Sequence, residues 1–184
     1  NADGTYSFTY DGVAVTVKAT FLAIPDNGNQ GADTWTNPFA DVKSTDWFYE
    51  HVRYVSQNGL MSGTTGTTFA PSAQLSRGML VTILWRMENT PKSTGTNPFT
   101  DLTQDWYREA VLWASENNIV TGLGGGLFGP DDAVTREQLA TILYRYSSFK
   151  KQDVSASTDL SAYTDAGKIS DWAKDAMAWA HAKG

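Results

Sequence analysis

The chain has 184 residues, with 14 Lys and Arg against 20 Asp and Glu, a formal net charge of −6, two histidines and no cysteine. Without cysteine there are no disulfides, thiolate metal sites or cysteine nucleophiles, and a net acidic chain with dispersed basic residues is a poor candidate for nucleic-acid binding. The hydrophobic content of 41% is too high for a disordered chain, and no run of 18 apolar residues predicts membrane insertion.

The first third of the chain begins with a predicted β-hairpin. Residues 5–21 are rich in Thr, Val, Tyr and Phe, and Asp11-Gly12 supplies a turn between two runs. Two strands alone are marginally stable, so residues 1–22 are expected to be the remnant of a preceding β-domain. Residues 23–36 are dense in Gly, Asn and Asp and predict a linker. The chain has no initial Met, and Asn1-Ala2 resembles a cloning scar, so we expect an excised fragment, in which the absence of a signal peptide carries no information.

The rest of the chain repeats itself, and this repetition predicts the architecture. The segment DWFYEHVRYVSQNGLMSG at 46–63 returns 59 residues later as DWYREAVLWASENNIVTG, and the register holds without a gap through Arg77 and Arg136. A third copy begins near Tyr163, and its Trp172 lies 66 residues after Trp106. We therefore predict one repeat at 37–93, a second at 94–158 and the first half of a third at 159–184.

Each full repeat is predicted to form a helix, a loop and a second helix. The first helix is expected to begin at Asp46 or Asp105, whose carboxylates suit a helix start, and to end at Gly59 or Asn118, which suit a left-handed cap.

The second helix is expected to begin at Ser76 or Thr135, and Thr135 with Gln138 fits the capping box. One such unit cannot cover its own apolar face, so the repeats must pack on one another. The sequence therefore predicts a mainly α fold with an N-terminal β-hairpin.

Motifs for catalysis, metals or cofactors are incomplete. A G-x-G-x-x-G runs from Gly124 to Gly129, but no strand precedes it and no helix follows directly, so a loop is the better interpretation. His51 and His181 are not at equivalent positions of the repeats, and no nucleophile, base and orienting group stand together in a motif. We expect no catalytic residue, no metal site and no cofactor, and therefore no enzyme in this fragment.

Two arginines at helix starts favour a binding role. Arg77 and Arg136 directly follow the capping hydroxyls, at the positive end of each second helix, where a cation costs about 0.3–1 kcal/mol. A bound anion would remove that cost, because free backbone N–H groups and a guanidinium both suit a carboxylate or phosphate. A structural ion pair with Asp41 or Asp101 explains the arginines equally well, so both interpretations stay open.

The tryptophans beside the first-helix starts are the aromatic candidates for binding. Trp47, Trp106 and Trp172 lie close to loops, where a ring can stack on the face of a sugar. Tyr54, Trp113 and Trp179 lie further along the helices and are expected to belong to the core.

The residues of the repeat resemble a known family. The segments PFADVKSTDWFYEHVRYVSQNGL and PFTDLTQDWYREAVLWASENNIV, each followed by G-x-x-x-F-x-P spacing and a Ser-Arg or Thr-Arg pair, are similar to S-layer homology repeats. The resemblance covers residues 37–184 and implies repeats packed as a pseudo-threefold bundle. The N-terminal hairpin resembles the end of a small β-repeat domain.

The resemblance implies an extracellular module that holds a secreted protein non-covalently to the cell wall, in Gram-positive bacteria through a secondary cell-wall polymer bearing an acidic pyruvate ketal. The family's binding arginine corresponds to Arg77 and Arg136. Asp41, Asp101, Trp47 and Trp106 are expected to assist as ligand-binding residues.

Two other roles stay open, protein–protein assembly within a surface layer and attachment of a secreted enzyme whose catalytic domain lies upstream. Self-association that completes the third repeat is a possible further partnership.

Overall fold

The computed structural model describes residues 5–10, 13–18 and 35–183 and contains two compact units. One unit is Thr34–Val154, and the other combines Asn1–Asp33 with Ser155–Gly184. Most of the predicted linker and the predicted turn at Asp11-Gly12 lie outside the described residues.

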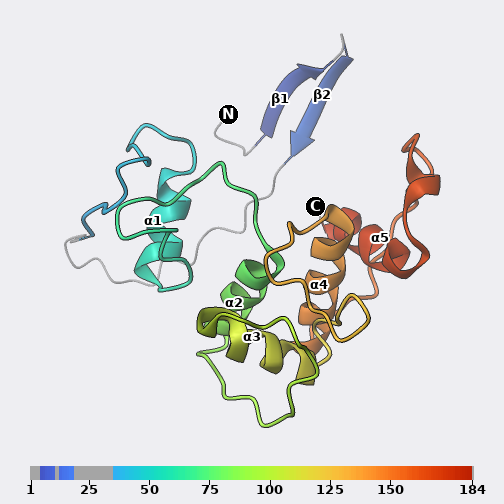
Figure 1. Ribbon diagram of the computed structural model, residues 1–184. Helices are drawn as coiled ribbons and strands as arrows, with labels where there is room; N and C mark the ends of the chain where they lie inside the picture. Colours follow the sequence, from blue (N-terminus) through green and yellow to red (C-terminus); the bar gives the residue numbers. More distant parts are fainter. Residues whose placement is uncertain (1–4, 11–12, 19–34, 184) are drawn as a thin grey trace. The chain divides into compact units, whose positions relative to one another are not determined.

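Two strands form the N-terminal sheet. Strands β1 (Thr5–Tyr10) and β2 (Val13–Lys18) pair antiparallel, with Thr5 opposite Lys18 (Figure 1). The assignment of residues 1–22 to a preceding β-domain stays a prediction.

The rest of the described chain is helical, as the repeat pattern predicts. The unit Thr34–Val154 contains four helices, α1 (Tyr49–Gln57), α2 (Arg77–Met87), α3 (Asp105–Glu116) and α4 (Arg136–Phe149). The segment predicted to be the first half of a third repeat contains the 3₁₀ turns η1 (Ala166–Lys168) and η2 (Asp171–Ala173) and helix α5 (Lys174–Lys183). None of the described helices has the length and apolar character needed to cross a membrane. The pseudo-threefold bundle stays a prediction.

The predicted starts of the second helices are confirmed. The Ser76 hydroxyl accepts a hydrogen bond from the Met79 N–H at 3.2 Å. In the second repeat the Thr135 hydroxyl accepts from the Gln138 N–H at 3.2 Å, and the Gln138 side chain accepts from the Thr135 N–H at 3.1 Å. The reciprocal pair is the capping box that the sequence indicates.

The predicted start of the first helix is confirmed at Asp105 in the second repeat and lies three residues too early at Asp46 in the first. Helix α1 begins at Tyr49, three residues after Asp46, because the Asp46 carboxylate accepts from the Lys43 N–H at 2.7 Å and caps a preceding turn instead. Helix α3 begins at Asp105, but the capping position belongs to Gln104. Both carboxylates still lie near helix starts, where they suit the dipole.

The ends of the first helices follow the sequence. Gly59 and Asn118 have positive φ values of 67° and 58°, the left-handed cap that both residue types favour.

The main core lies among α2, α3 and α4. Figure 1 shows α2 beside α3, and the largest side chains without solvent exposure are in this core, namely Val81, Tyr107, Val111, Ile119 and Phe128. A smaller core contains Phe39, Val42 and Val52 beside α1. The second helix of the first repeat thus packs on the helices of the next repeat, which is the stacking that two-helix units require.

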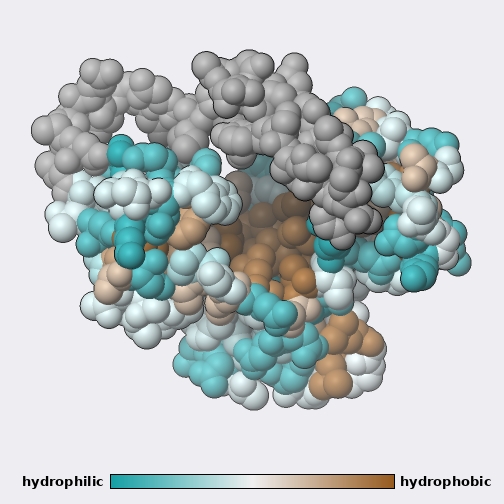
Figure 2. Space-filling model, turned by 90° about the horizontal axis from the view of Figure 1, so that it is seen from above, coloured by the Kyte–Doolittle hydropathy of each residue, from teal (hydrophilic) through white to brown (hydrophobic). Residues whose placement is uncertain are grey.

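Apolar surface also remains exposed. Figure 2 shows patches of brown hydrophobic surface among teal hydrophilic surface. The large apolar side chains with substantial exposure in the unit Thr34–Val154 are Trp47, Met87, Trp106, Leu123, Leu127 and Phe149.

A backbone seam joins the start of α2 to the loop before α4. The Gly78 N–H donates to the Pro130 carbonyl at 2.8 Å, and the Val134 N–H donates to the Leu75 carbonyl at 2.9 Å. A Cβ on Gly78 would lie 3.0 Å from the Pro130 oxygen, closer than ordinary contacts. Glycine therefore suits this position of the first repeat.

The repeated glycines Gly63 and Gly122 are required by close packing. A Cβ on Gly122 would lie 2.5 Å from the Leu127 carbonyl oxygen and 2.8 Å from the Phe99 ring, whereas nothing lies within 4 Å of a Cβ on Gly66.

We expect Gly122→Ala to lower the free energy of unfolding by about 1–3 kcal/mol through overpacking. Gly66→Ala is the matched control and should be nearly neutral. Urea unfolding followed by tryptophan fluorescence measures both, and equal effects would contradict this assignment.

Candidate functional site

A groove of about 580 Å³ lies within the unit Thr34–Val154. One wall is the loop from Leu60 to Leu75, a second is the side of α2 that carries Ile83 and Arg86, and Trp106 of the next repeat contributes an aromatic ring. The groove is therefore assembled from both full repeats.

Arg86 gives the groove its charge. It is the one charged side chain among the lining residues, in a chain whose net charge is −6. Its Nη1 donates to the Leu60 carbonyl at 3.0 Å, and within the described part of the chain its other N–H groups have no hydrogen-bond partner. A guanidinium fixed at one nitrogen and open at the others is suited to a carboxylate or phosphate.

Arg86 was not among the site residues predicted from the sequence. The signal was present, because Arg86 and Arg145 also lie 59 residues apart in the repeat register. An arginine inside a helix does not have the unfavourable interaction with the positive helix end that marked Arg77 and Arg136. The repeat spacing alone therefore did not distinguish Arg86 from an ordinary surface residue.

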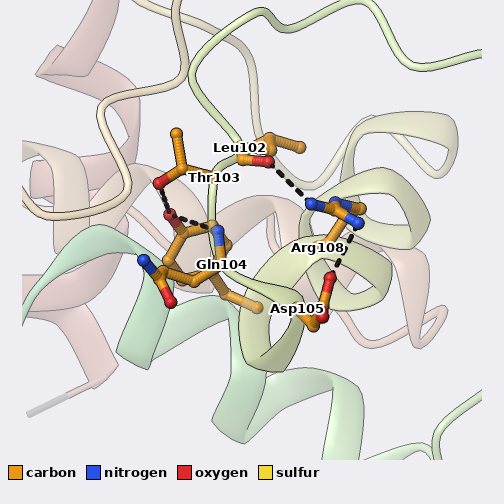
Figure 3. Close-up of polar contacts among 6 residues, drawn as sticks. Leu102, Thr103, Gln104, Asp105 and Arg108 are labelled. Atoms are coloured by element: carbon orange, nitrogen blue, oxygen red, sulfur yellow. Dashed lines mark hydrogen bonds and ion pairs between the residues drawn. The ribbon is translucent and has the colours of Figure 1, made fainter.

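The start of α3 fixes the position of Trp106. The Tyr107 hydroxyl accepts from the Gln104 N–H at 3.2 Å, and Arg108 pairs with Asp105 at 2.7 Å while donating to the Leu102 carbonyl (Figure 3). The Trp106 ring meets the Tyr107 ring edge-on, with centroids 4.8 Å apart. Trp106 is 46% exposed and lines the groove.

Arg77 lies outside the groove lining and is 4% exposed. Its Nε donates to the Phe128 carbonyl at 3.0 Å, its Nη2 donates to the Thr121 carbonyl at 3.1 Å, and its Cζ lies 4.6 Å from the Phe128 ring centroid. Burial lowers the pKa of Arg77, and the nearby Asp132 and Asp101 carboxylates oppose that change. These contacts favour the structural interpretation, with carbonyl oxygens as the direct partners, and ligand binding by Arg77 stays a prediction.

Asp41 and Asp101 hold the loops between the helices. Asp101 accepts from the N–H groups of Phe128 and Gly129, at 2.9 and 2.7 Å, and Asp41 accepts from those of Phe69 and Ala70 at the same two distances. Each carboxylate thus ties its F-x-D segment to the F-x-P segment of the same repeat.

The bonds from the loop N–H groups explain the pKa changes of both carboxylates. The hydrogen bond from the Phe69 N–H is the main reason that the pKa of Asp41 is lowered. Burial alone would raise the pKa of Asp101, but the N–H groups of Phe128 and Gly129 outweigh it and the pKa is lowered.

Trp47 and Arg136 also lie outside the groove lining. Trp47 is 84% exposed and meets the Phe48 ring edge-on at 5.4 Å. Arg136 is exposed, and among the described residues it has no hydrogen bond or ion pair. The structure therefore brings one of the six predicted site residues, Trp106, into the groove.

The glycine motif at 124–129 is a loop, as expected. Gly124, Gly125, Gly126 and Gly129 all have positive φ values, and helix α4 begins only at Arg136.

No group of three or more His, Asp or Glu side chains suited to a metal ion occurs in the described ranges.

The loop-holding role of Asp101 predicts a pH-dependent stability. Asp101→Asn should lower the free energy of unfolding at pH 7 by about 1–3 kcal/mol, because two backbone donors lose a charged acceptor. The pKa of Asp101 is lowered in the folded protein, so its contribution is complete above the ordinary Asp range and is lost as pH falls through the folded value. The difference between variant and parent should therefore shrink below about pH 4.

The control for this experiment is Asp131→Asn, at an exposed turn residue with no hydrogen bond in the described structure. Thermal unfolding across pH 3–8 measures both variants. A deficit for Asp101→Asn that is constant across this range would contradict the role of its charge.

Comparison with known proteins identifies the repeats. The S-layer homology domain family matches residues 38–78 and 98–140. An endoglucanase of Bacillus sp. (strain KSM-635) is 31% identical over 140 residues, which are 76% of this chain and 15% of that protein. The S-layer protein sap of Bacillus anthracis is 26% identical over 106 residues, 57% of this chain and 13% of that protein.

A third relative is the cellulosome-anchoring protein of Acetivibrio thermocellus, 26% identical over 118 residues, which are 61% of this chain and 25% of that protein. The chain thus spans a quarter or less of the length of each of these relatives.

Proposed function

Because residues 38–78 and 98–140 are S-layer homology domains, we propose that this chain holds its parent protein non-covalently at the outer surface of the bacterial cell. The domains are anchoring modules, and the chain acts outside the cell, on the cell wall. The ligand is an acidic secondary cell-wall polysaccharide, and the anchoring itself involves no catalysis.

The proposal rests on the single positive charge in the groove lining, that of Arg86. Arg86 is the one charged lining residue, and apolar side chains such as Phe69 and Ile83 surround it. Such a site favours a ligand with one carboxylate beside apolar groups. A pyruvate ketal on a sugar has this composition, with a carboxylate for Arg86 and a methyl group for the apolar wall. The C–H face of the sugar ring then stacks on Trp106.

The other predicted site residues serve the groove indirectly. Asp41 fixes Phe69 and Ala70, which line the groove, and Arg77 holds the two repeats whose surfaces form it. Trp47 and Arg136 lie outside this groove and remain candidates for contacts with a longer polymer.

Attachment of a secreted enzyme is the second candidate function, and the relatives favour it. One relative is an endoglucanase and another is a cellulosome-anchoring protein, each of which is much longer than this chain. In that case the anchoring chemistry of the groove is the same, and the catalytic domain lies elsewhere in the parent protein. A protein–protein assembly role within a surface layer is the third candidate.

Binding to purified cell-wall sacculi tests the proposal. Arg86→Gln keeps a donor for the Leu60 carbonyl but removes the charge, and it should weaken binding about 10–100-fold, the value of a charge-assisted hydrogen bond. Lys92→Gln makes the same charge change at an exposed residue outside the groove and should bind like the parent.

Sacculi stripped of their secondary polymer separate the alternatives. Binding of the parent chain should be lost on stripped sacculi. Equal binding before and after stripping would contradict the polymer as ligand, and unchanged binding of Arg86→Gln would contradict the groove as its site.

A further inference from the structure

The first helices of the two full repeats end in the same kind of cap. Asn58 ends α1 with φ −87° and ψ 7°, and Asn117 ends α3 with φ −90° and ψ 10°. The Asn58 side-chain amide donates to the Tyr54 carbonyl at 2.8 Å, and the Asn117 side-chain amide donates to the Trp113 carbonyl at 2.8 Å. The two asparagines therefore have nearly the same conformation and equivalent side-chain partners.

The residue that follows each asparagine is different. Gly59 follows Asn58, and Asn118 follows Asn117, with left-handed φ values of 67° and 58°. The backbone therefore takes the same path after both caps. The chemical difference at this step is a side chain on Asn118, which Gly59 lacks.

This difference bears on the chemical stability of Asn58. An asparagine followed by glycine is prone to deamidation, because no side chain obstructs the approach of the glycine nitrogen. The Gly59 nitrogen bonds to the Asn58 Cγ and gives up its proton, the Cγ–Nδ2 bond breaks, and ammonia leaves with that proton. The succinimide ring that forms then takes up water and opens to aspartate or isoaspartate. The side chain of Asn118 slows the same attack on Asn117.

The reaction requires the cap to open, and α1 opens more readily than α3. The Gly59 N–H donates to the Ser56 carbonyl at 3.1 Å and the Asn58 amide is bonded to Tyr54, so the closed cap keeps both reacting groups in place. Helix α1 has nine residues and one buried side chain, Val52, whereas α3 has twelve residues, five of them buried. Helix ends with few buried contacts open at the lowest free energy.

We propose that Asn58 is a site of spontaneous deamidation and that the product alters the groove. The Leu60 N–H donates to the Val55 carbonyl at 2.8 Å, and the Leu60 carbonyl accepts from Arg86 Nη1 at 3.0 Å. Isoaspartate at position 58 adds a carbon to the main chain before Leu60 and moves this carbonyl away from Arg86. The new carboxylate also replaces the donor to the Tyr54 carbonyl at the negative end of α1.

The two parts of the proposal have different foundations. Deamidation of Asn58 does not rest on the proposed function, because the reacting atoms belong to adjacent residues and need only water. The loss of polymer binding that follows from it does rest on the proposed function.

Peptide mapping of the aged protein tests the site. The 184-residue chain is kept at about pH 8 and 37 °C for several weeks, and trypsin then releases Asn58 in the peptide 54–77 and Asn117 in the peptide 109–136. Mass spectrometry should show that the modified fraction rises severalfold faster at Asn58 than at Asn117, with isoaspartate among the products. A sample digested without ageing measures modification during handling.

Exchanging the following residues provides matched variants. Gly59→Asn should lower the modified fraction at Asn58 to that of Asn117, and Asn118→Gly should raise the fraction at Asn117. Both variants keep a residue type that favours the left-handed cap, and among the described residues nothing lies within 4 Å of a Cβ on Gly59. Circular dichroism verifies that each variant is folded.

Binding to sacculi measures the effect on the groove. The aged parent chain should bind more weakly than the fresh chain, whereas aged Gly59→Asn should bind like its own fresh sample. The other Asn-Gly pair, Asn27-Gly28, is present in both proteins, so its modification does not explain a difference between them. Failure of the fresh parent chain to bind would contradict the proposed function, and the mass spectrum alone would then decide the assignment of Asn58.

Three results would overturn the proposal. Equal modified fractions at Asn58 and Asn117 in the aged parent chain would contradict the site. An unchanged fraction at Asn58 in Gly59→Asn would contradict the role of the glycine. Equal binding of fresh and aged parent chain, with Asn58 modified, would contradict the effect on the groove.

Discussion

A buried guanidinium needs hydrogen-bond acceptors, and Arg77 finds them in the neighbouring repeat. The side chain is 4% exposed, and its two bonds go to carbonyl groups 44 and 51 residues away in the sequence. Leaving such groups unpaired costs far more than the bond itself contributes. The start of α2 in the first repeat is therefore stable only when the loop of the second repeat is folded against it. This dependence makes the two repeats one structural unit.

The geometry of the groove depends on the contact between the two repeats at Arg77. Arg86 lies on α2, and Trp106 lies at the start of α3 in the next repeat, so the distance between the cation and the ring is set by how α2 packs on α3. Arg77 thus supports a groove that it does not line. The acidic net charge of the chain is compatible with the proposed function, in which an anionic polymer would be attracted only at local arginines.

Local features were predictable from the sequence, and long-range partners were not. The caps at Ser76 and Thr135 and the left-handed residues Gly59 and Asn118 depend on neighbours within four residues, and the structure confirms them. The predicted helix start at Asp46 was wrong because a short carboxylate caps a turn as well as a helix. The role of Arg77 stayed open because its partners lie in another repeat, and Arg86 was missed because the loop that makes it a groove residue is brought there only by folding.

The same arginine position is buried and hydrogen-bonded in the first repeat, whereas Arg136 of the second repeat has no hydrogen bond or ion pair among the described residues. Unfolding of Arg77→Met and Arg136→Met by urea, at a few micromolar protein, compares them directly. We predict that Arg77→Met lowers the free energy of unfolding by about 2 kcal/mol or more, because two carbonyl groups lose their donor, and that Arg136→Met changes it by less than about 0.5 kcal/mol. Equal losses for the two variants, or a stable Arg77→Met, would contradict it.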